Sequence, residues 1–259
     1  MTLKQKLDYH YKAFDKTKIS PDPLQFLHLF ADEKDIEAAG FISSIFAYGN
    51  VKQIINTLDK IFLIAGKSPF DFIFNFHKMG IPGGMKTLKH RFYTSEDITV
   101  LFTVLNMIYN EYGMLKYLFL KFYKPGEPDI KNTLSRFSNF FLESVQKVNE
   151  GNLTQGLRFM FPLPELGSAC KRMNLFLRWM IREDELDFGI WNEVPKNKLI
   201  IPVDTHVARI CRTLGLTERR NVSWKMAEEI TQSLKKFDPA DPVKYDFAIC
   251  HIGMRKLAF

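Results

Sequence analysis

The sequence predicts an all-α protein, and three observations support this. Apolar residues recur at three- and four-residue spacing along almost the whole chain, as they do in amphipathic helices. No run shows the strict alternation of apolar and polar residues that a half-buried strand needs. Hydrophobic residues make up 46% and charged residues 25% of the 259 residues, a balance typical of a globular protein with a large core.

Two helices are expected in the amino-terminal quarter of the chain. The first lies in the segment 35–49, and its apolar stripe is formed by Ile36, Ala39, Ile42, Ile45 and Phe46. The second lies in the segment 51–66, which follows a Gly-Asn pair and stops at Gly66.

Two longer amphipathic helices are expected in the middle of the chain. The segment 94–113 opens with Thr94 or Ser95 as its N-cap and has acidic residues in its first turn. The segment 129–148 has the same amphipathic pattern. Turns rich in proline and glycine interrupt the helical pattern at 79–84, 124–129 and 161–167.

A turn at 163–167 leads into a helix that ends near residue 184. The expected buried stripe of this helix is Ala169, Met173, Phe176, Leu177 and Met180. Lys171 falls in the first turn, where the positive end of the helix dipole disfavours a charged amine. Such an amine becomes a nucleophile if it is also desolvated. The alternative interpretation is that Lys171 is a solvated surface lysine with no functional role. Arg178 and Arg182 are expected on the exposed side.

The segment IIPVDTHVARICRTLGL (200–216) places a single aspartate at the start of another helix. Apolar residues follow Asp204 at helical spacing, and Gly215 is expected to end the helix, which predicts a helix over 205–214. From the residues alone, Asp204 is either a helix cap or a catalytic carboxylate. A metal site is disfavoured, because Asp204 and His206 stand two residues apart and do not share a helix face.

Composition limits the class of protein. The three cysteines (Cys170, Cys211 and Cys250) are too few and too far apart for a disulfide framework, which favours a reducing cytoplasmic setting. No signal peptide and no stretch of about 18 apolar residues is present, so we expect no membrane partner. Thirty-six Lys and Arg against 29 Asp and Glu leave a formal charge of +7, which favours approach to polyanions such as nucleic acids.

Two segments together resemble a known family. LPELGSACKRMNLFL (163–177) and VDTHVARICRTLGL (203–216) are similar to the helix-hairpin-helix (HhH-GPD) DNA glycosylase superfamily, which includes endonuclease III and the 8-oxoguanine glycosylases. Lys171 matches the family's catalytic lysine and Asp204 its catalytic aspartate. The resemblance is good over 163–259 and faint over 36–65. The whole chain resembles an uncharacterised bacterial family of about this length.

This resemblance implies a two-lobed helical glycosylase fold with a cleft between the lobes. Lys171 would lie in a middle lobe of residues 33–184, and Asp204 in a second lobe formed by 1–32 and 185–259. The implied activity is excision of a damaged base, such as 8-oxoguanine, from double-stranded DNA, with AP-lyase activity through a Schiff base on Lys171. We expect a cytoplasmic, nucleoid-associated monomer.

The resemblance also implies DNA contacts. Tyr48 matches the position of a residue that fills the gap left by an extruded base. The other expected DNA-binding residues are Gly167, Ser168, Arg172, Arg178, Arg209 and Arg212. Aromatic residues that could stack on a base are plentiful, but Trp179 and Trp191 fit a core role as well as a pocket wall.

The turn at 163–167 and the residues up to Lys171 match the hairpin of the family. This hairpin departs from the family pattern. The family usually has two glycines there, whereas only Gly167 remains, and Ser168 and Ala169 lengthen the turn. The resemblance allows a monovalent cation at the hairpin, but the four-cysteine motif is missing, so neither an iron–sulfur cluster nor another cofactor is expected. The long gap between Lys171 and Asp204 is similar to that of the archaeal 8-oxoguanine glycosylases.

Two alternatives to a glycosylase stay open. One is a non-catalytic nucleic-acid-binding helical module of the same fold, which the altered hairpin favours and the Lys171–Asp204 pair opposes. The other is a helical enzyme or scaffold that acts on something other than nucleic acid.

Overall fold

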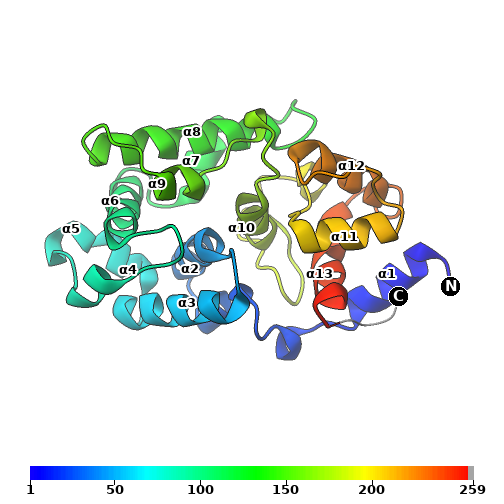
Figure 1. The fold of residues 1–259 in the computed structure, drawn as a ribbon, viewed down its shortest axis with the longest axis horizontal. Helices are drawn as coiled ribbons and strands as arrows, with labels where there is room; N and C mark the ends of the chain where they lie inside the picture. The colour runs from blue at the N-terminus through cyan, green and yellow to red at the C-terminus, as the bar shows by residue number, and fades with distance from the viewer. Residues whose placement is uncertain (256–259) are drawn as a thin grey trace. The chain divides into compact units, whose positions relative to one another are not determined.

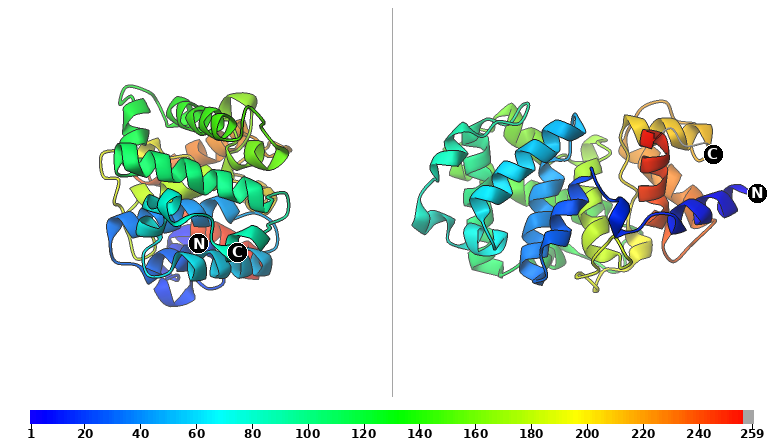
Figure 2. Two further views of the ribbon diagram at one scale, coloured as in Figure 1. Left: turned by 90° about the vertical axis from the view of Figure 1, so that its left-hand side faces the viewer. Right: turned by 90° about the horizontal axis from the view of Figure 1, so that it is seen from below.

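The computed structural model describes the backbone of residues 1–255 and the side chains of residues 1–250 (Figures 1 and 2). This part of the chain is helical and contains no β-strand, which confirms the all-α prediction. Residues 256–259 of the expected second lobe lie outside the described residues. None of the described helices is both long enough and apolar enough to cross a lipid bilayer.

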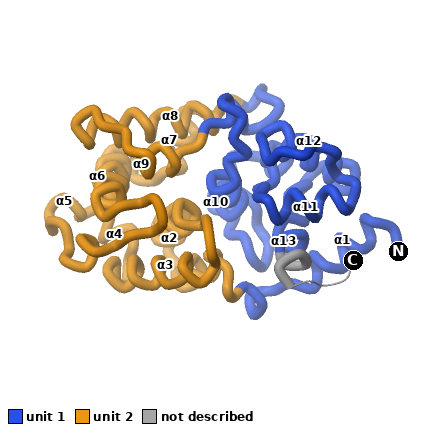
Figure 3. The backbone as a smooth tube through the Cα atoms, in the orientation of Figure 1, with its two compact units in different colours: residues 1–19, 125–132, 163–259 blue, residues 20–124, 133–162 orange. Residues whose placement is uncertain are grey.

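The helices form two compact units, which Figure 3 colours separately. Unit 1 comprises Met1–Ile19, Pro125–Asn132 and Leu163–Phe259. Unit 2 comprises Ser20–Lys124 and Thr133–Pro162.

Unit 2 is built around one long helix, α6. Its α-helices are α2 (Glu33–Phe46), α3 (Val51–Ala65), α4 (Pro69–Phe74), α5 (Phe76–Met79), α6 (Ser95–Tyr112), α7 (Leu115–Phe122), nearly all of α8 (Lys131–Val148) and α9 (Gln155–Met160), with the 3₁₀ helices η2 (Pro23–Leu29) and η3 (Gly83–Thr87). α6 packs against α4, α5, α7 and α9. Thr94 caps α6 in a capping box with Asp97, as one of the two expected caps.

Unit 1 joins the two ends of the chain. Its helices are α1 (Leu3–Lys12), α10 (Lys171–Ile181), α11 (Thr205–Thr213), α12 (Trp224–Lys235) and α13 (Asp246–Arg255), with the 3₁₀ helices η1 (Lys16–Lys18), η4 (Pro164–Leu166), η5 (Lys196–Lys198) and η6 (Pro242–Tyr245). α13 packs against both α11 and α1. The first helix of the chain is therefore part of the same core as the last.

The six helices that the sequence predicted by range are present as α2, α3, α6, α8, α10 and α11. α11 spans the predicted segment, and Gly215 ends it with φ +68°, where its N–H donates to the carbonyl of Arg212. The short helices α4, α5, α7 and α9 were not predicted, because six or so residues carry too little periodicity to be recognised.

The observed units differ from the expected lobes of 33–184 and of 1–32 with 185–259. The helix that carries Lys171, α10, belongs to unit 1 together with Asp204, and not to a middle lobe. The physical reason is that α10 is buried on nearly every side and forms ion pairs with residues of unit 1 that follow it in the sequence.

Candidate active site

An amine and a carboxylate from distant parts of the sequence meet in unit 1. Lys171 Nζ lies 3.8 Å from Asp204 Oδ2. The side chains remain 29% and 38% exposed, so a ligand from solvent has access to both. The structure thus brings together the two residues that the sequence predicted to be catalytic.

Asp204 performs its capping role with one oxygen only. Oδ1 accepts the backbone N–H groups of His206 at 2.9 Å and Val207 at 3.0 Å, which are free donors in the first turn of α11. Oδ2 is the oxygen that faces Lys171. The two interpretations of Asp204, cap and chemical group, are therefore compatible.

The loop that precedes Lys171 is held in a tight conformation. Cys170, the N-cap of α10, has φ +47°, a left-handed conformation that is uncommon for a residue with a Cβ. Its N–H donates to Ser168 Oγ at 3.2 Å. The buried Asn174 reaches back from α10 and donates its Nδ2 to the carbonyl of Ala169 at 3.0 Å. These hydrogen bonds fix the position of the backbone from which the Lys171 side chain extends.

Helix α12 forms hydrogen bonds with the segment before Lys171 and with the segment before Asp204. At its first residue, Trp224 donates its backbone N–H to the carbonyl of Gly167 at 3.0 Å, which holds the hairpin. Two turns later, Thr231 Oγ1 accepts the N–H of Ile201 at 3.0 Å, which holds the buried extended segment that leads to Asp204. The approach of Lys171 to Asp204 thus depends on α12.

The hairpin keeps one feature that close approach of a ligand requires. Gly167 has φ +85°, and no atom lies within 4 Å of the position where a Cβ would stand. Leu166, next to it, is 80% exposed. The expected role of Gly167 and Ser168 in phosphate binding stays a prediction, as does a monovalent cation at this turn.

Two arginines expected to bind DNA are instead inside unit 1. Arg172 is 5% exposed and Arg178 is 3% exposed. Arg182, expected on the exposed side of the same helix, is 2% exposed. The prediction that Arg178 and Arg182 lie on an exposed face is wrong, because both guanidinium groups form ion pairs with carboxylates of unit 1.

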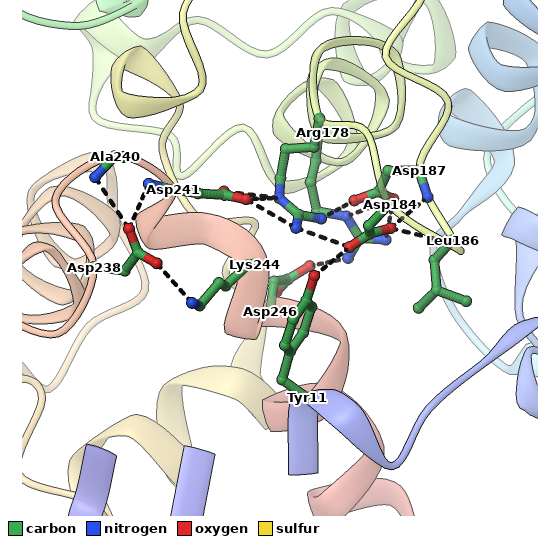
Figure 4. A network of polar contacts seen from close by, with 11 residues as sticks. Tyr11, Arg178, Asp184, Leu186, Asp187, Asp238, Ala240, Asp241, Lys244 and Asp246 are labelled. Atoms are coloured by element: carbon green, nitrogen blue, oxygen red, sulfur yellow. Dashed lines mark hydrogen bonds and ion pairs between the residues drawn. The ribbon is translucent and has the colours of Figure 1, made fainter. Parts of the chain in front are cut away.

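Arg178 and Arg182 anchor a buried network of charges (Figure 4). Arg178 binds Asp246 (Nη1–Oδ2 2.5 Å) and Asp187 (Nη2–Oδ1 3.1 Å). Arg182 also binds Asp187, and in addition Asp184 at 2.9 Å and Asp241 at 2.8 Å. Two guanidinium groups therefore face four carboxylates.

Because the network contains more carboxylates than guanidinium groups, the pKa values of the carboxylates differ from one another. Burial raises the pKa of Asp246 to about 6 against the opposing charge of Arg178, and burial also raises the pKa of Asp187. For Asp184, burial is outweighed by the charge of Arg182 and by backbone N–H donors, which lower its pKa to about 2. A proton taken up by the network therefore goes to the two most buried carboxylates.

A known protein family matches most of both units. Its description is "Protein of unknown function (DUF2400)", and the match covers residues 22–255. The chain belongs to the DUF2400 family. Neither a curated protein nor a solved structure matches it.

The acidic residues of the DUF2400 network escaped the sequence analysis. Asp187 lies in the long gap between Lys171 and Asp204, and Asp241 and Asp246 lie in the carboxy-terminal tail. A usable signal was present: Arg178 and Arg182 stand four apart in the stretch 175–182, whose other positions are apolar. Buried arginines need carboxylate partners, and the segments 183–187 and 238–246 are rich in them.

Two other expected DNA-binding arginines of this DUF2400 chain are exposed. Arg209 and Arg212 lie on the solvent side of α11. Arg212 donates one guanidinium N–H to the carbonyl of Arg220 at 2.7 Å. Their contact with DNA stays a prediction.

Tyr48 of the DUF2400 chain is half-buried in unit 2 and is anchored at its hydroxyl. The hydroxyl donates to the carbonyl of His90 at 2.8 Å and accepts the N–H of Phe92 at 3.3 Å. Its ring lies against the rings of His90 and Phe159, with centroids 4.8 Å away in each case. Gap filling by Tyr48 stays a prediction, and exposed groups beside it are Arg91, Phe92 and Phe159.

Among the described residues of this DUF2400 chain, no group of three or more His, Cys, Asp and Glu side chains is placed to hold a metal ion. Trp179 and Trp191 are fully buried, which makes them core residues and not a pocket wall.

Proposed function

We propose that this protein is a DNA base-excision glycosylase with AP-lyase activity and a two-lobed HhH-GPD-like architecture. The observation that carries the proposal is the 3.8 Å approach of Lys171 Nζ to Asp204 Oδ2 on an accessible surface. An amine beside a carboxylate is the pair that Schiff-base chemistry on a sugar needs. The resemblance of the same two segments to the glycosylase superfamily supports this assignment.

The proposed reaction begins with proton transfer. Asp204 accepts a proton from the Lys171 ammonium, which frees the Nζ lone pair. Nζ then bonds to C1′ of the deoxyribose while the bond from C1′ to the base breaks, and the base leaves with that electron pair and is protonated. Transfer of the proton from Asp204 to the departing base restores the carboxylate, which stabilises the positive charge that develops on the sugar.

Strand cleavage follows from the covalent intermediate. Opening of the sugar ring gives a protonated Schiff base between Nζ and C1′. Loss of a proton from C2′ then expels the 3′ phosphate as the C3′–O bond breaks. Hydrolysis of the Schiff base returns the free amine of Lys171.

The substrate we propose is double-stranded DNA with a damaged base, for example an oxidised purine such as 8-oxoguanine. Extrusion of a base costs a few kcal/mol and is cheapest for a damaged or mispaired one. Arg209 and Arg212, exposed on the helix that Asp204 caps, are the proposed phosphate contacts. We place this activity on nucleoid DNA in the cytoplasm.

Borohydride trapping tests the proposal. The protein is incubated with oligonucleotides that contain 8-oxoguanine, uracil, an oxidised pyrimidine or an abasic site, and borohydride then reduces any Schiff base to a stable adduct. We expect an adduct with wild type that is lost in Lys171→Gln. Lys225→Gln, which removes an exposed lysine of α12, is the matched control and should still form the adduct.

The alternatives give different results in the same experiment. Salt-sensitive DNA binding without an adduct on any substrate would identify a non-catalytic nucleic-acid-binding module. The absence of both binding and adduct would point to a protein that acts on something else.

A further inference from the structure

A sharp turn in unit 2 presents an arginine and a phenylalanine to solvent. His90 and Tyr93 exchange backbone hydrogen bonds of 3.0 and 2.9 Å, and Arg91 and Phe92 form the tip between them. Arg91 has φ +53°, a conformation that a residue with a Cβ rarely adopts. Strain of this kind often accompanies functional surfaces and persists only where the surroundings enforce it.

The surroundings of this turn do enforce it. The Tyr48 hydroxyl bonds to the backbone on both sides of Arg91, at the carbonyl of His90 and the N–H of Phe92. His90 is buried, and its ring contacts Thr57 Oγ1 at 3.0 Å and the carbonyl of Tyr48 at 3.2 Å. The tip is therefore rigid before any ligand binds.

Aromatic rings gather at this tip and remain exposed. Phe92 is 46% exposed and Phe159, at the end of α9, is 39% exposed. Their ring centroids lie 5.7 Å apart, and both rings contact the half-buried ring of Tyr48. Exposed apolar side chains that are grouped into one contiguous patch mark interaction surfaces.

Two arginine side chains lie beside these rings. The Arg91 guanidinium lies over the rings of Tyr48 and Phe92, at 5.4 and 5.5 Å from the centroids, and forms no ion pair with any described residue. Arg158, next to Phe159, is exposed and also has no carboxylate partner in the described part of the chain. Lys52 and Lys89, close in sequence to Tyr48 and Arg91, are also exposed, and Lys89 interacts with Glu96.

We propose that the surface formed by Tyr48, Arg91, Phe92 and Phe159 binds single-stranded nucleic acid, with unpaired bases stacked on Phe92 and Phe159 and phosphates on Arg91 and Arg158. Flat hydrophobic rings beside unpaired arginines match the two parts of a nucleotide, the base and the phosphate. A duplex does not fit this surface as well, because its bases already cover one another's faces. The proposal does not depend on the chemistry of Lys171, which lies in unit 1.

Equilibrium binding of undamaged, labelled oligonucleotides of about twelve nucleotides tests this proposal. The full chain carries Lys171→Gln throughout, so that covalent chemistry cannot contribute. The probes are a DNA strand, an RNA strand, the corresponding DNA duplex and a strand of the same backbone that lacks bases. Comparison of the DNA and RNA strands shows which nucleic acid is preferred.

We expect Phe92→Ala to weaken binding of the base-containing single strand by about fivefold or more, the loss of one stacked base. Binding of the strand without bases should not change. Arg91→Lys keeps the charge but loses the planar guanidinium, and should weaken the base-containing strand less than Arg91→Ala does. Tyr117→Ala removes a 54% exposed ring of α7 in the same unit and should bind like the parent.

Three results would overturn the proposal: no binding of any single strand, equal losses in Phe92→Ala and Tyr117→Ala, or an equal loss for strands with and without bases. Thermal unfolding of each variant shows whether the fold is retained. A failure here leaves the adduct experiment on Lys171 untouched, and a missing adduct leaves this binding result untouched.

Discussion

Arg178 on α10 binds Asp246 in the first turn of α13, with Nη1 and Oδ2 2.5 Å apart and both side chains almost fully buried. Since α13 packs against α11, this pair ties the helix that begins with Lys171 to the helix that Asp204 caps. Buried charges outside the candidate site thus help to fix its geometry.

Asp187 is the carboxylate shared by both arginines, so its loss should be the most damaging change in the network. We expect Asp187→Ala to lower the free energy of unfolding by about 3–5 kcal/mol, because it leaves two buried guanidinium groups short of a partner. Urea denaturation measures the change. The neighbouring Glu185→Ala, at an exposed position, should change stability by no more than about 0.5 kcal/mol; similar losses in both variants would contradict the role of the network.

Asp246 should make stability depend on pH. Its pKa is about 6 in the folded protein, whereas an unperturbed aspartate carboxyl has a pKa of 3.8. Between about pH 4 and pH 6 the folded state therefore binds more protons than the unfolded state, so this group's contribution makes the free energy of unfolding fall as pH rises, and the contribution is constant above pH 6.

The variant Asp246→Asn cannot titrate and keeps an oxygen that accepts from Arg178. We expect its unfolding free energy to fall less steeply than that of wild type across the same window. Denaturation curves at several pH values between 4 and 7 measure both slopes. Parallel slopes for the two proteins would show that Asp246 does not take up the proton.

Because one oxygen of Asp204 caps α11 and the other faces Lys171, substitutions can test the capping role and the catalytic role separately. Asp204→Asn keeps an oxygen that caps α11, so its stability should stay close to that of wild type, whereas Asp204→Ala should lose about 1 kcal/mol. Both variants lack the carboxylate that faces Lys171 and should lose the borohydride adduct. An adduct of normal yield in Asp204→Asn would rule out the proposed proton transfer.

Gly49 lies close to the side chain of Arg91, at the tip of the strained turn between His90 and Tyr93. It has φ +98°, and a Cβ there would stand 2.7 Å from Nη1 and 2.8 Å from Cδ of Arg91. We expect Gly49→Ala to cost about 1 kcal/mol or more in stability and to displace the Arg91 side chain. Binding of single-stranded oligonucleotides should weaken in parallel, whereas Gly66→Ala, also at positive φ but with open space around it, should affect stability alone.

Local features of the sequence were sufficient to predict six of the longer helices and the cap at Asp204, but not the short helices. An N-cap and its helix depend on residues within one or two turns, so the residues that determine them are close together in the sequence. The pairing of Asp204 with Lys171 was different. It came from a resemblance to a family, because nothing in the spacing of two residues so far apart reveals that they meet.

The errors have a common physical origin. Arg178 and Arg182 were placed on an exposed face because charged residues are seldom buried. Their burial depends on Asp187, Asp241 and Asp246, which come from two later segments of the chain. The surface at Arg91 and Phe92 was missed for the same reason, since it needs Tyr48 and Phe159 from distant segments.

The support that α12 gives to the hairpin and to the segment before Asp204 has a consequence for synthesis. A nascent chain exposes Lys171 long before Thr231 leaves the ribosome, and α1 must wait for α13 to be made. Unit 2, complete by residue 162, can fold while translation continues. The amine and carboxylate of the site therefore come together only after α12 has been synthesised, and a polypeptide truncated before that helix would be inert at this site.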